Sequence, residues 1–335
     1  MARRAVDSVN NIFSHLNRSE PVEIAVGEEA ADDATEQRLL GRLGEYAALA
    51  VAPLNMRPTG AVLLADEPGR VEVRVSTPGR HIVLVLATRG DLAGELFFLR
   101  TMALKNLPAP RLISHDLSQR RLPCTYLLLS HICGAPLSLV SDPALLRVAG
   151  RATGRTLRRL HQVEAPGFGR VTPSGRWLAA SWHEALLDWL GQRMVLSRAE
   201  ALLGTELAGA LWAATLDHPA LAYAQPRVLH GALAPERVLV TAGESVQLEA
   251  LIRPGDLVAG DPLFDLATGL LPHQPDGFRQ GLREGYSASG PLDLGQESRL
   301  RRLELLLWVV RELEGDDAAL AGLPEAVCAR LVALA

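Results

Sequence analysis

The stretch from residue 227 to residue 267 holds the densest set of side chains that could do chemistry. Its candidate residues are His230, the arginines Arg237 and Arg253, and the carboxylates of Glu236, Asp256 and Asp261. Carboxylates this close in sequence could hold a cation, but the two arginines compete for them and repel a metal ion. The residue types therefore weigh against a metal site. The chain also has no zinc-type spacing of Cys and His, no Walker loop and no nucleophile elbow.

Short strands and turns must position these side chains. Apolar residues at 228–229, 238–240 and 246–252 predict three strands, and the residues between the second and third have the composition of a turn. Asp261 followed by Pro262 predicts the start of a helix, with Asp261 as N-cap and Pro262 at the first helical position. The polar residues are thus expected in loops and at a helix start.

This order of elements resembles the catalytic segment of the aminoglycoside phosphotransferase family, the antibiotic- and choline-kinase-like branch of the protein-kinase fold. The residues in the family's register are His230-Gly231, Val238-Leu239-Val240, Gly260-Asp261-Pro262 and Asp265-Leu266-Ala267. The resemblance covers roughly residues 55–335. It implies an α+β, bilobal protein-kinase-like fold, with a small β-rich N-lobe, a larger helical C-lobe and a hinge near residues 130–136.

The resemblance also implies that the phosphoryl-transfer residues are replaced. Ala232 stands at the family's catalytic-base Asp, Arg237 at its metal-binding Asn and Arg253 at its second metal-binding Asp. Phosphoryl transfer relies on a carboxylate and on Mg²⁺, and a guanidinium cannot coordinate a cation. We therefore expect no metal and no cofactor, and a site that attracts an anion.

The predicted substrate-binding residues are Arg237, Arg253, His230, Asp256 and Asp261, and no catalytic residue is assigned. The two arginines could bind an anionic ligand through paired hydrogen bonds, or they could simply neutralise nearby carboxylates. In the family, the residue at His230 organises the backbone, and the one at Asp265 ties the same loop through backbone hydrogen bonds. His161 is also expected to be structural.

The scarcity of lysine and asparagine also indicates that the phosphoryl-transfer residues are replaced. The single lysine is Lys105, and no asparagine follows Asn106. An active kinase-fold enzyme needs a lysine on the third strand of its small lobe and an asparagine in its large lobe. The resemblance places Val85 at that lysine and Glu95 at its usual partner. Because a buried unpaired charge is unfavourable, we expect Glu95 to pair with an arginine or to face water.

The expected domains are an N-terminal extension at 1–54, a small lobe at 55–132 and a helical lobe at 133–335. The extension contains a possible strand at 22–26 and one amphipathic helix at 36–50. Strands of the small lobe are predicted at 62–65, 71–75 and 82–86. A helix at 300–313 presents one apolar face to the core of the large lobe.

Composition excludes some classes of protein. The chain has 335 residues, 48% of them apolar, and a formal net charge of −4, which argues against a general nucleic-acid binder. No apolar run is long enough for a membrane span, and residues 1–20 lack the apolar core of a signal peptide, so we expect a cytoplasmic protein. Cys124, Cys133 and Cys328 fit neither a disulfide framework nor a zinc site and are expected to be buried.

Three functions remain open, and whether the chain is an enzyme is open with them. In the first, it has lost Mg-ATP-dependent phosphoryl transfer and binds an anionic or peptide substrate in the cleft between the lobes. Phosphotransferase-like proteins without kinase residues occur in pathways that modify ribosomal peptides, which suggests a thioether-forming cyclase. In the second, it is a non-catalytic pseudokinase partner of an active kinase-like enzyme. In the third, it is a residual, atypical small-molecule phosphotransferase.

Overall fold

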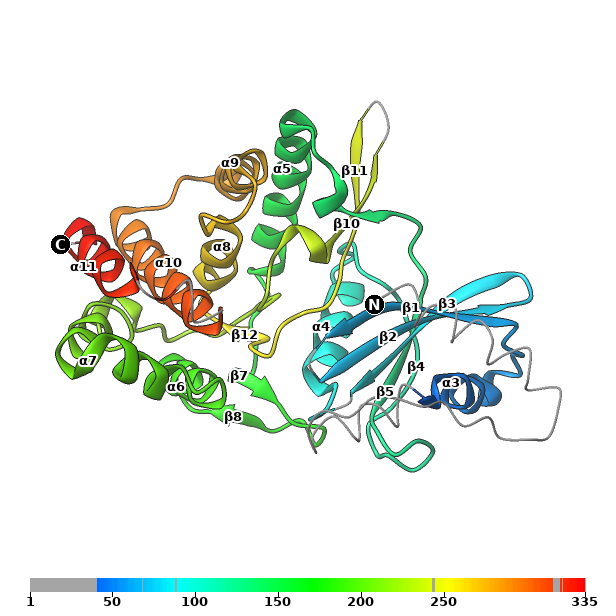
Figure 1. Cartoon of the computed structure of the whole chain (residues 1–335). Coiled ribbons are helices and arrows are strands. Elements are labelled where there is room, and N and C mark those ends of the chain that lie inside the picture. Colours follow the sequence, from blue (N-terminus) through cyan, green and yellow to red (C-terminus); the bar gives the residue numbers. More distant parts are fainter. Residues whose placement is uncertain are drawn as a thin grey trace. The chain divides into compact units, whose positions relative to one another are not determined.

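The structure, a computed structural model, describes residues 41–334 except 68, 88, 243–244, 316–319 and 321. The chain divides into two compact units (Figure 1). Residues up to 99 together with 110–132 form unit 1, and residues 100–109 together with those from 133 onward form unit 2. The strand expected at 22–26 and the first part of the helix expected at 36–50 lie outside the described residues.

Unit 1 is built on one antiparallel sheet. Its strands follow the spatial order β1-β2-β3-β5-β4, with β1 (Gly60–Glu67), β2 (Arg70–Thr77), β3 (Arg80–Ala87), β4 (Leu112–Asp116) and β5 (Tyr126–Ser130). The three predicted strands lie inside β1, β2 and β3. Each observed strand is longer than predicted, because the pairing of β2 with β3 runs on to Arg70↔Ala87 at one end and Thr77↔Arg80 at the other.

The alternation of β2 explains where the core of unit 1 lies. Val71, Val73 and Val75 occupy every second position and are fully buried, as expected for β-branched residues on one face of a strand. They share a hydrophobic cluster with residues of α3 (Leu43–Val51), which continues into the 3-10 helix η1 (Ala52–Leu54). Helix α4 (Ala93–Leu104) then carries the chain into unit 2.

Unit 2 combines two small sheets with a bundle of helices. One sheet has the order β11-β10-β6, formed by β6 (Ala135–Pro136), β10 (Val238–Ala242) and β11 (Val246–Leu251). The other has the order β8-β7-β12-β9, formed by β7 (Phe168–Val171), β8 (Trp177–Ala179), β9 (Arg227–Val228) and β12 (Ala259–Gly260).

The helices of unit 2 include α5 (Pro143–Leu160), α6 (Trp182–Gln192), α7 (Val195–Ala214), α8 (Leu263–Leu270), α9 (Asp276–Tyr286), α10 (Leu294–Glu314) and α11 (Leu323–Leu334). Short 3-10 helices lie at η2 (Leu137–Leu139), η3 (Pro219–Leu221), η4 (Pro235–Arg237) and η5 (Ser287–Ser289). The helix expected at 300–313 lies within α10. Its predicted apolar face is buried, at Leu303, Leu306, Leu307 and Val310.

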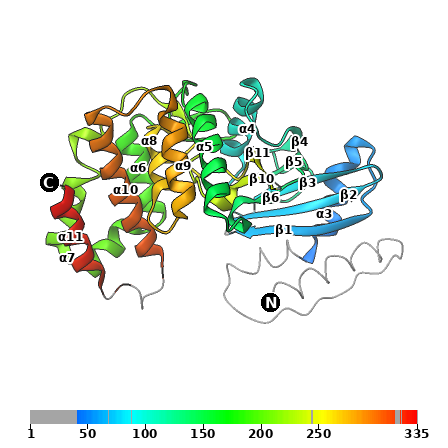
Figure 2. The same cartoon turned by 90° about the horizontal axis from the view of Figure 1, so that it is seen from above.

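Helices α5 and α9 lie side by side at very short range (Figure 2). A Cβ added at Gly281 or at Gly285 would lie 2.1 Å from the carbonyl oxygen of Arg147 or of Arg151, respectively. On the opposite side, a Cβ at Gly154 would lie 2.3 Å from the carbonyl oxygen of Leu282. Glycine on both helices therefore lets the two backbones touch, and no other residue fits at these positions without moving a helix.

The cysteine prediction is wrong for two of the three residues. Cys124 is buried, and burial raises the pKa of its thiol to about 11, but Cys133 and Cys328 are exposed. Cys133 lies three residues after the end of β5, and Cys328 lies on an exposed position of α11, so neither residue is covered by a core. Within the described part of the chain, no helix is both long and apolar enough to cross a membrane.

Candidate functional site

One buried carboxylate holds the loop that follows β9. Asp265, in the first turn of α8, is completely buried. One of its oxygens accepts the backbone N–H of His230 at 2.6 Å, and the other accepts that of Gly231 at 2.7 Å. His161, just after α5, places Nε2 3.0 Å from the same carboxylate and Nδ1 3.0 Å from the hydroxyl of Tyr286. The expectation that Asp265 ties this loop through backbone hydrogen bonds is confirmed.

The loop then turns sharply against a second loop. Gly231 has a φ of +78°, and a Cβ at this position would lie 2.2 Å from the carbonyl oxygen of Leu257. The N–H of Gly255 donates to the carbonyl of His230 at 2.8 Å, and a Cβ on Gly255 would lie 2.8 Å from the Cβ of Ala232. Ala232 therefore packs directly on the segment that carries Arg253.

His230 is fully buried at the base of this loop pair. Its Nε2 lies 3.0 Å from the carbonyl oxygen of Ile252, which fixes Nε2 as the protonated nitrogen because a carbonyl only accepts. Burial lowers the pKa of His230 to about 4, and Arg237 adds to this effect, while Asp265 opposes it. The imidazole is therefore neutral at neutral pH and joins the two loops through its hydrogen bond to Ile252.

The structure brings Arg237 and Arg253 together. Arg237 ends η4, and its Nη1 donates a hydrogen bond to the backbone carbonyl of Arg253 at 2.7 Å. Arg253 has a φ of +54°, in the left-handed region that a non-glycine residue adopts only at some energetic expense. Both side chains are half-buried. Arg237 is thus tied to the backbone of Arg253 within one loop pair, next to Ala232.

Asp256 lies on the same second loop, where its side chain is exposed. Its carboxylate is 3.6 Å from Nη2 of Arg193, which follows α6. The other terminal nitrogen of Arg193 is 2.6 Å from Glu314 at the end of α10, and the guanidinium lies over the ring of Trp189 at 4.7 Å. Asp256 therefore joins a chain of charges that links the second loop to α6 and α10.

Asp261 lies deeper, at the start of α8. One carboxylate oxygen accepts the N–H of Leu263 at 3.0 Å. Helix α8 begins at Leu263 with Pro262 at the N-cap, so the predicted N-cap at Asp261 is one residue early. The other carboxylate oxygen of Asp261 is 2.8 Å from Nε of Arg299 on α10, close enough for an ion pair. Burial raises the pKa of Asp261, and Arg299 opposes that rise. Arg299 also lies over the ring of Tyr223 at 5.1 Å, so Asp261 is part of a buried cluster with α10.

Unit 1 contains a charge cluster of its own. The Nη2 of Arg70 lies 2.6 Å from Glu72 and 2.8 Å from Glu95, and its Nε lies 3.0 Å from Glu95. Both glutamates are buried, so the expectation that an arginine pairs with Glu95 is confirmed. Val85 is fully buried in β3, directly across from Glu72. Arg70 on β2 is therefore shared by two carboxylates, and Glu95 has this arginine as its partner.

Several of these partners have no strong sequence signal. Most of the carboxylates are distant in sequence from the arginines that they contact, which are Arg193, Arg299 and Arg70. The exception is the contact between Arg70 and Glu72, which are two residues apart. The spacing of that pair did carry a signal, because residues two apart on a strand lie on the same face.

The loop pair does not suit a divalent cation. Arg237 directs a guanidinium to the Arg253 carbonyl, an oxygen that a cation would otherwise attract, and Ala232 supplies no ligand. In the part of the chain that the structure describes, no group of three or more His, Cys, Asp or Glu side chains is arranged to hold a metal ion.

The sequence matches the family model described as "Phosphotransferase enzyme family" over residues 67–302. No curated protein sequence matches the chain significantly.

Several solved structures are similar in fold. A thermostable mutant of aminoglycoside phosphotransferase APH(4)-Ia, in a ternary complex with ADP and hygromycin B, has a TM-score of 0.62 at 16% identity, covering 88% of this chain and 98% of that one. A putative fructosamine-3-kinase from Haemophilus somnus 129PT has a TM-score of 0.59 at 16% identity, covering 84% and 95%. The macrolide 2'-phosphotransferase MphH from Brachybacterium faecium has a TM-score of 0.54 at 19% identity, covering 86% and 98%. Identities this low show the fold alone, and the fold that we expected is confirmed.

Proposed function

Since the chain belongs to the phosphotransferase enzyme family, we propose that it keeps this fold without Mg-ATP-dependent phosphoryl transfer and binds an anionic or peptide ligand at the Arg237–Arg253 loop pair. The observation that carries the proposal is the hydrogen bond from the Arg237 guanidinium to the Arg253 carbonyl. The resemblance puts both arginines at positions where the family holds a metal ion, and this bond keeps the Arg237 guanidinium next to the backbone of Arg253. Replacing the ligands of a cation by cations reverses the sign of the charge that a site attracts.

The replaced residues support the loss of phosphoryl transfer. Ala232 cannot orient an attacking hydroxyl, and the positions of Arg237 and Arg253 supply no magnesium ligand. In unit 1, the cluster of Arg70, Glu72 and Glu95 has a formal charge of −1. In the family, a lysine near this position would contact the nucleotide phosphates. These groups act as a unit in catalysis, so their losses do not add as small independent effects.

The nature of the arginine site supports an anionic ligand. Guanidinium groups bind carboxylates and phosphates through two parallel hydrogen bonds and need no metal for this. A charge-assisted hydrogen bond contributes about 1.5–3 kcal/mol, a change of roughly ten- to a hundredfold in affinity. Half-burial favours such contacts, since partial removal from water strengthens them while the side chains stay accessible.

A thioether-forming cyclisation is the specific reaction that suits this site. A cysteine thiolate would add to the β-carbon of a dehydrated Ser or Thr residue, forming one C–S bond. Negative charge would pass to the adjacent carbonyl oxygen, and the α-carbon would then take up a proton equivalent to the one lost by the thiol. The mass does not change and no oxidant is needed. Arg237 or Arg253 would stabilise the charge on that oxygen, a contribution typically of about 10²- to 10³-fold in rate.

The test of phosphoryl transfer is calorimetry with Mg-ATP. We expect no binding heat that depends on magnesium, and the same result after treatment with EDTA. Micromolar, metal-dependent binding of ATP would contradict the proposal and favour a residual phosphotransferase.

The test of cyclisation uses a synthetic peptide that contains one cysteine and one dehydroalanine. We expect free thiol to disappear at unchanged mass faster with the protein than without it, and more slowly with Arg253→Ala. Arg155→Ala, an exposed arginine on α5, is the matched control. Equal rates with and without protein would exclude the cyclase. Copurification with an active kinase-like enzyme, and faster turnover by that enzyme, would instead support the non-catalytic partner.

A further inference from the structure

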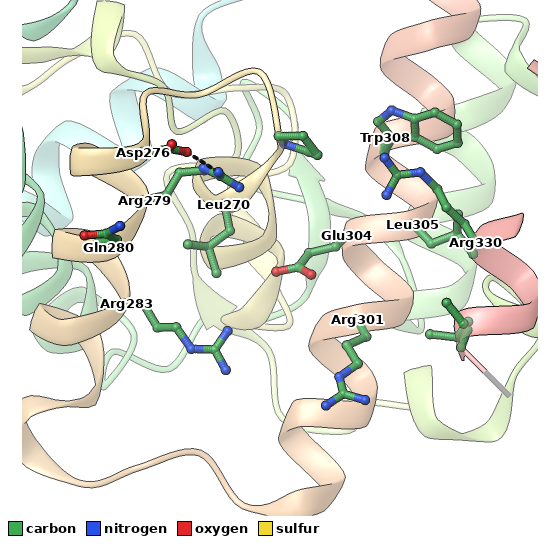
Figure 3. Close-up of a pocket in the computed structure, with 13 residues that line it drawn as sticks. Leu270, Asp276, Arg279, Gln280, Arg283, Arg301, Glu304, Leu305, Trp308 and Arg330 are labelled. Atoms are coloured by element: carbon green, nitrogen blue, oxygen red, sulfur yellow. Dashed lines mark hydrogen bonds and ion pairs between the residues drawn. The ribbon is translucent and has the colours of Figure 1, made fainter. Parts of the chain in front are cut away.

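A pocket lies in the helical bundle of unit 2, built from residues other than those of the Arg237–Arg253 loop pair. It is a pocket of about 510 Å³ between the end of α8 and the helices α9, α10 and α11. A volume of this size suits a small organic molecule. Arginines enter it from three helices, Arg279 and Arg283 from α9, Arg301 from α10 and Arg330 from α11 (Figure 3).

The lining of this pocket is more positive than negative. Its four arginines face two lining carboxylates, Asp276 and Glu304. Arg279 forms an ion pair with Asp276. Nη2 of Arg283 lies 2.6 Å from both oxygens of Glu297, which holds that guanidinium in place. In Figure 3, Arg283 and Arg301 approach the same edge of the pocket from opposite helices, with Glu304 between them and Leu270.

Apart from Gln280, the rest of the wall is apolar. Leu270, Pro272 and Leu305 line the pocket together with Trp308. The guanidinium of Arg330 lies over the Trp308 ring at 4.0 Å, a distance typical of cation–π contact. A flat apolar group could lie against Leu305 and the exposed part of this ring while an attached acidic group reaches the arginines.

Glu304 gives the pocket a titratable group near neutrality. Its carboxyl is half-buried, and burial raises its pKa to about 7, while Arg283 and the other arginines oppose that rise and Glu297 adds to it. The charged groups that face it are Arg279, Arg283, Glu297 and Arg301. Protonation of Glu304 removes the one negative charge at the centre of the site.

We propose that this pocket binds a small organic acid, with its anionic group between Arg283 and Arg301 and its apolar body against Leu305 and Trp308. The site is separate from the Arg237–Arg253 loop pair and does not depend on the function proposed there. Binding an anion beside Glu304 favours the protonated carboxyl, so binding takes up a proton. Affinity therefore falls as pH rises through 7, because the ionised carboxylate then repels the ligand.

The experiment titrates the full chain with 1-anilinonaphthalene-8-sulfonate, an aromatic anion whose fluorescence rises on binding. We expect Arg301→Ala to weaken binding about tenfold, while Arg155→Ala leaves it unchanged. From pH 6 to pH 8, the wild-type affinity should fall about tenfold, whereas Glu304→Gln should bind equally at both values. Unfolding midpoints of all variants check that each is folded.

Two competitors identify the acidic group. Displacement of the probe by benzoate supports a carboxylate ligand, and displacement by phenyl phosphate supports a phosphate ligand. Failure of both to displace it, or equal binding by wild type and Arg301→Ala, would overturn the proposal. The same conclusion follows if Arg253→Ala rather than Arg301→Ala weakens binding, because the probe would then report the loop pair.

Discussion

The buried network around Asp265 and the loop that carries Arg237 and Arg253 adjoin each other in unit 2, but they differ in burial and in what they hold. Asp265, His161 and Tyr286 are 0%, 4% and 1% exposed and bind backbone or one another. The two arginines are half-buried. By the resemblance described above, the network keeps the residue types of the family and the loop pair does not. The comparison separates residues that hold a backbone from residues of the ligand site that we propose.

The largest expected effect follows from removing the carboxylate at the centre of the network. Asp265→Ala leaves the N–H groups of His230 and Gly231 buried without acceptors, so we expect a loss of about 3–5 kcal/mol in the free energy of unfolding. Urea denaturation measures it. Asp265→Asn, which keeps one acceptor oxygen, should lose less. A loss below about 1 kcal/mol for the alanine variant would mean that the loop is held by other contacts. The Asp265 network would then not differ from the Arg237–Arg253 loop pair in its contribution to stability.

A smaller effect follows from the titration of His230, whose pKa in the folded protein is about 4. The unfolded chain, with an ordinary histidine pKa near 6.5, binds the proton more readily. Stability is therefore fully present above about pH 6.5 and falls as pH drops towards 4, by about 3 kcal/mol in all. Asp261, whose pKa is raised, changes stability in the opposite direction.

His230→Gln isolates this contribution, since its side-chain amide can still donate to the Ile252 carbonyl but does not titrate. The measurement is urea unfolding of both proteins between pH 4 and pH 7. Parallel curves for the two proteins would show that His230 does not cause the acid sensitivity.

The smallest effect on stability is expected for a substitution in the Arg237–Arg253 loop pair. Arg253→Gly relieves a left-handed backbone while it loses the side chain, so the free energy of unfolding should change by less than about 1 kcal/mol. Binding of pyrophosphate measured without metal should weaken roughly ten- to a hundredfold. A large loss of stability would make Arg253 part of the framework.

The sequence was sufficient for the framework because its residues form a dense, ordered pattern. The roles of Asp265 and His230 followed from the resemblance to the family, and Asp261-Pro262 placed the start of α8 to within one residue. The strands of unit 1 could be placed from alternating valines, although their ends could not. Strand ends depend on how far the pairing continues, and Arg70 and Thr77 are polar residues that still pair.

The partners of the carboxylates could not be placed in the same way. Asp261 meets Arg299 and Asp256 meets Arg193 only because α6 and α10 pack beside the loops, and packing between distant helices leaves no spacing in the sequence. The pocket beside Glu304 was missed for the same reason. Its arginines come from three helices. In the sequence of each helix alone, the arginines have the pattern of an ordinary solvent-exposed face.

The contact of α9 with α5 also determines which wall of that pocket can move. Gly277, Gly281 and Gly285 fall at intervals of four residues and rest on the backbone of α5, while Arg279 and Arg283 lie on the pocket side of the same helix. A helix in backbone contact cannot shift towards its neighbour or rotate without steric overlap. The pocket therefore has one rigid wall, and a larger or smaller ligand must be accommodated by displacement of α10 and α11.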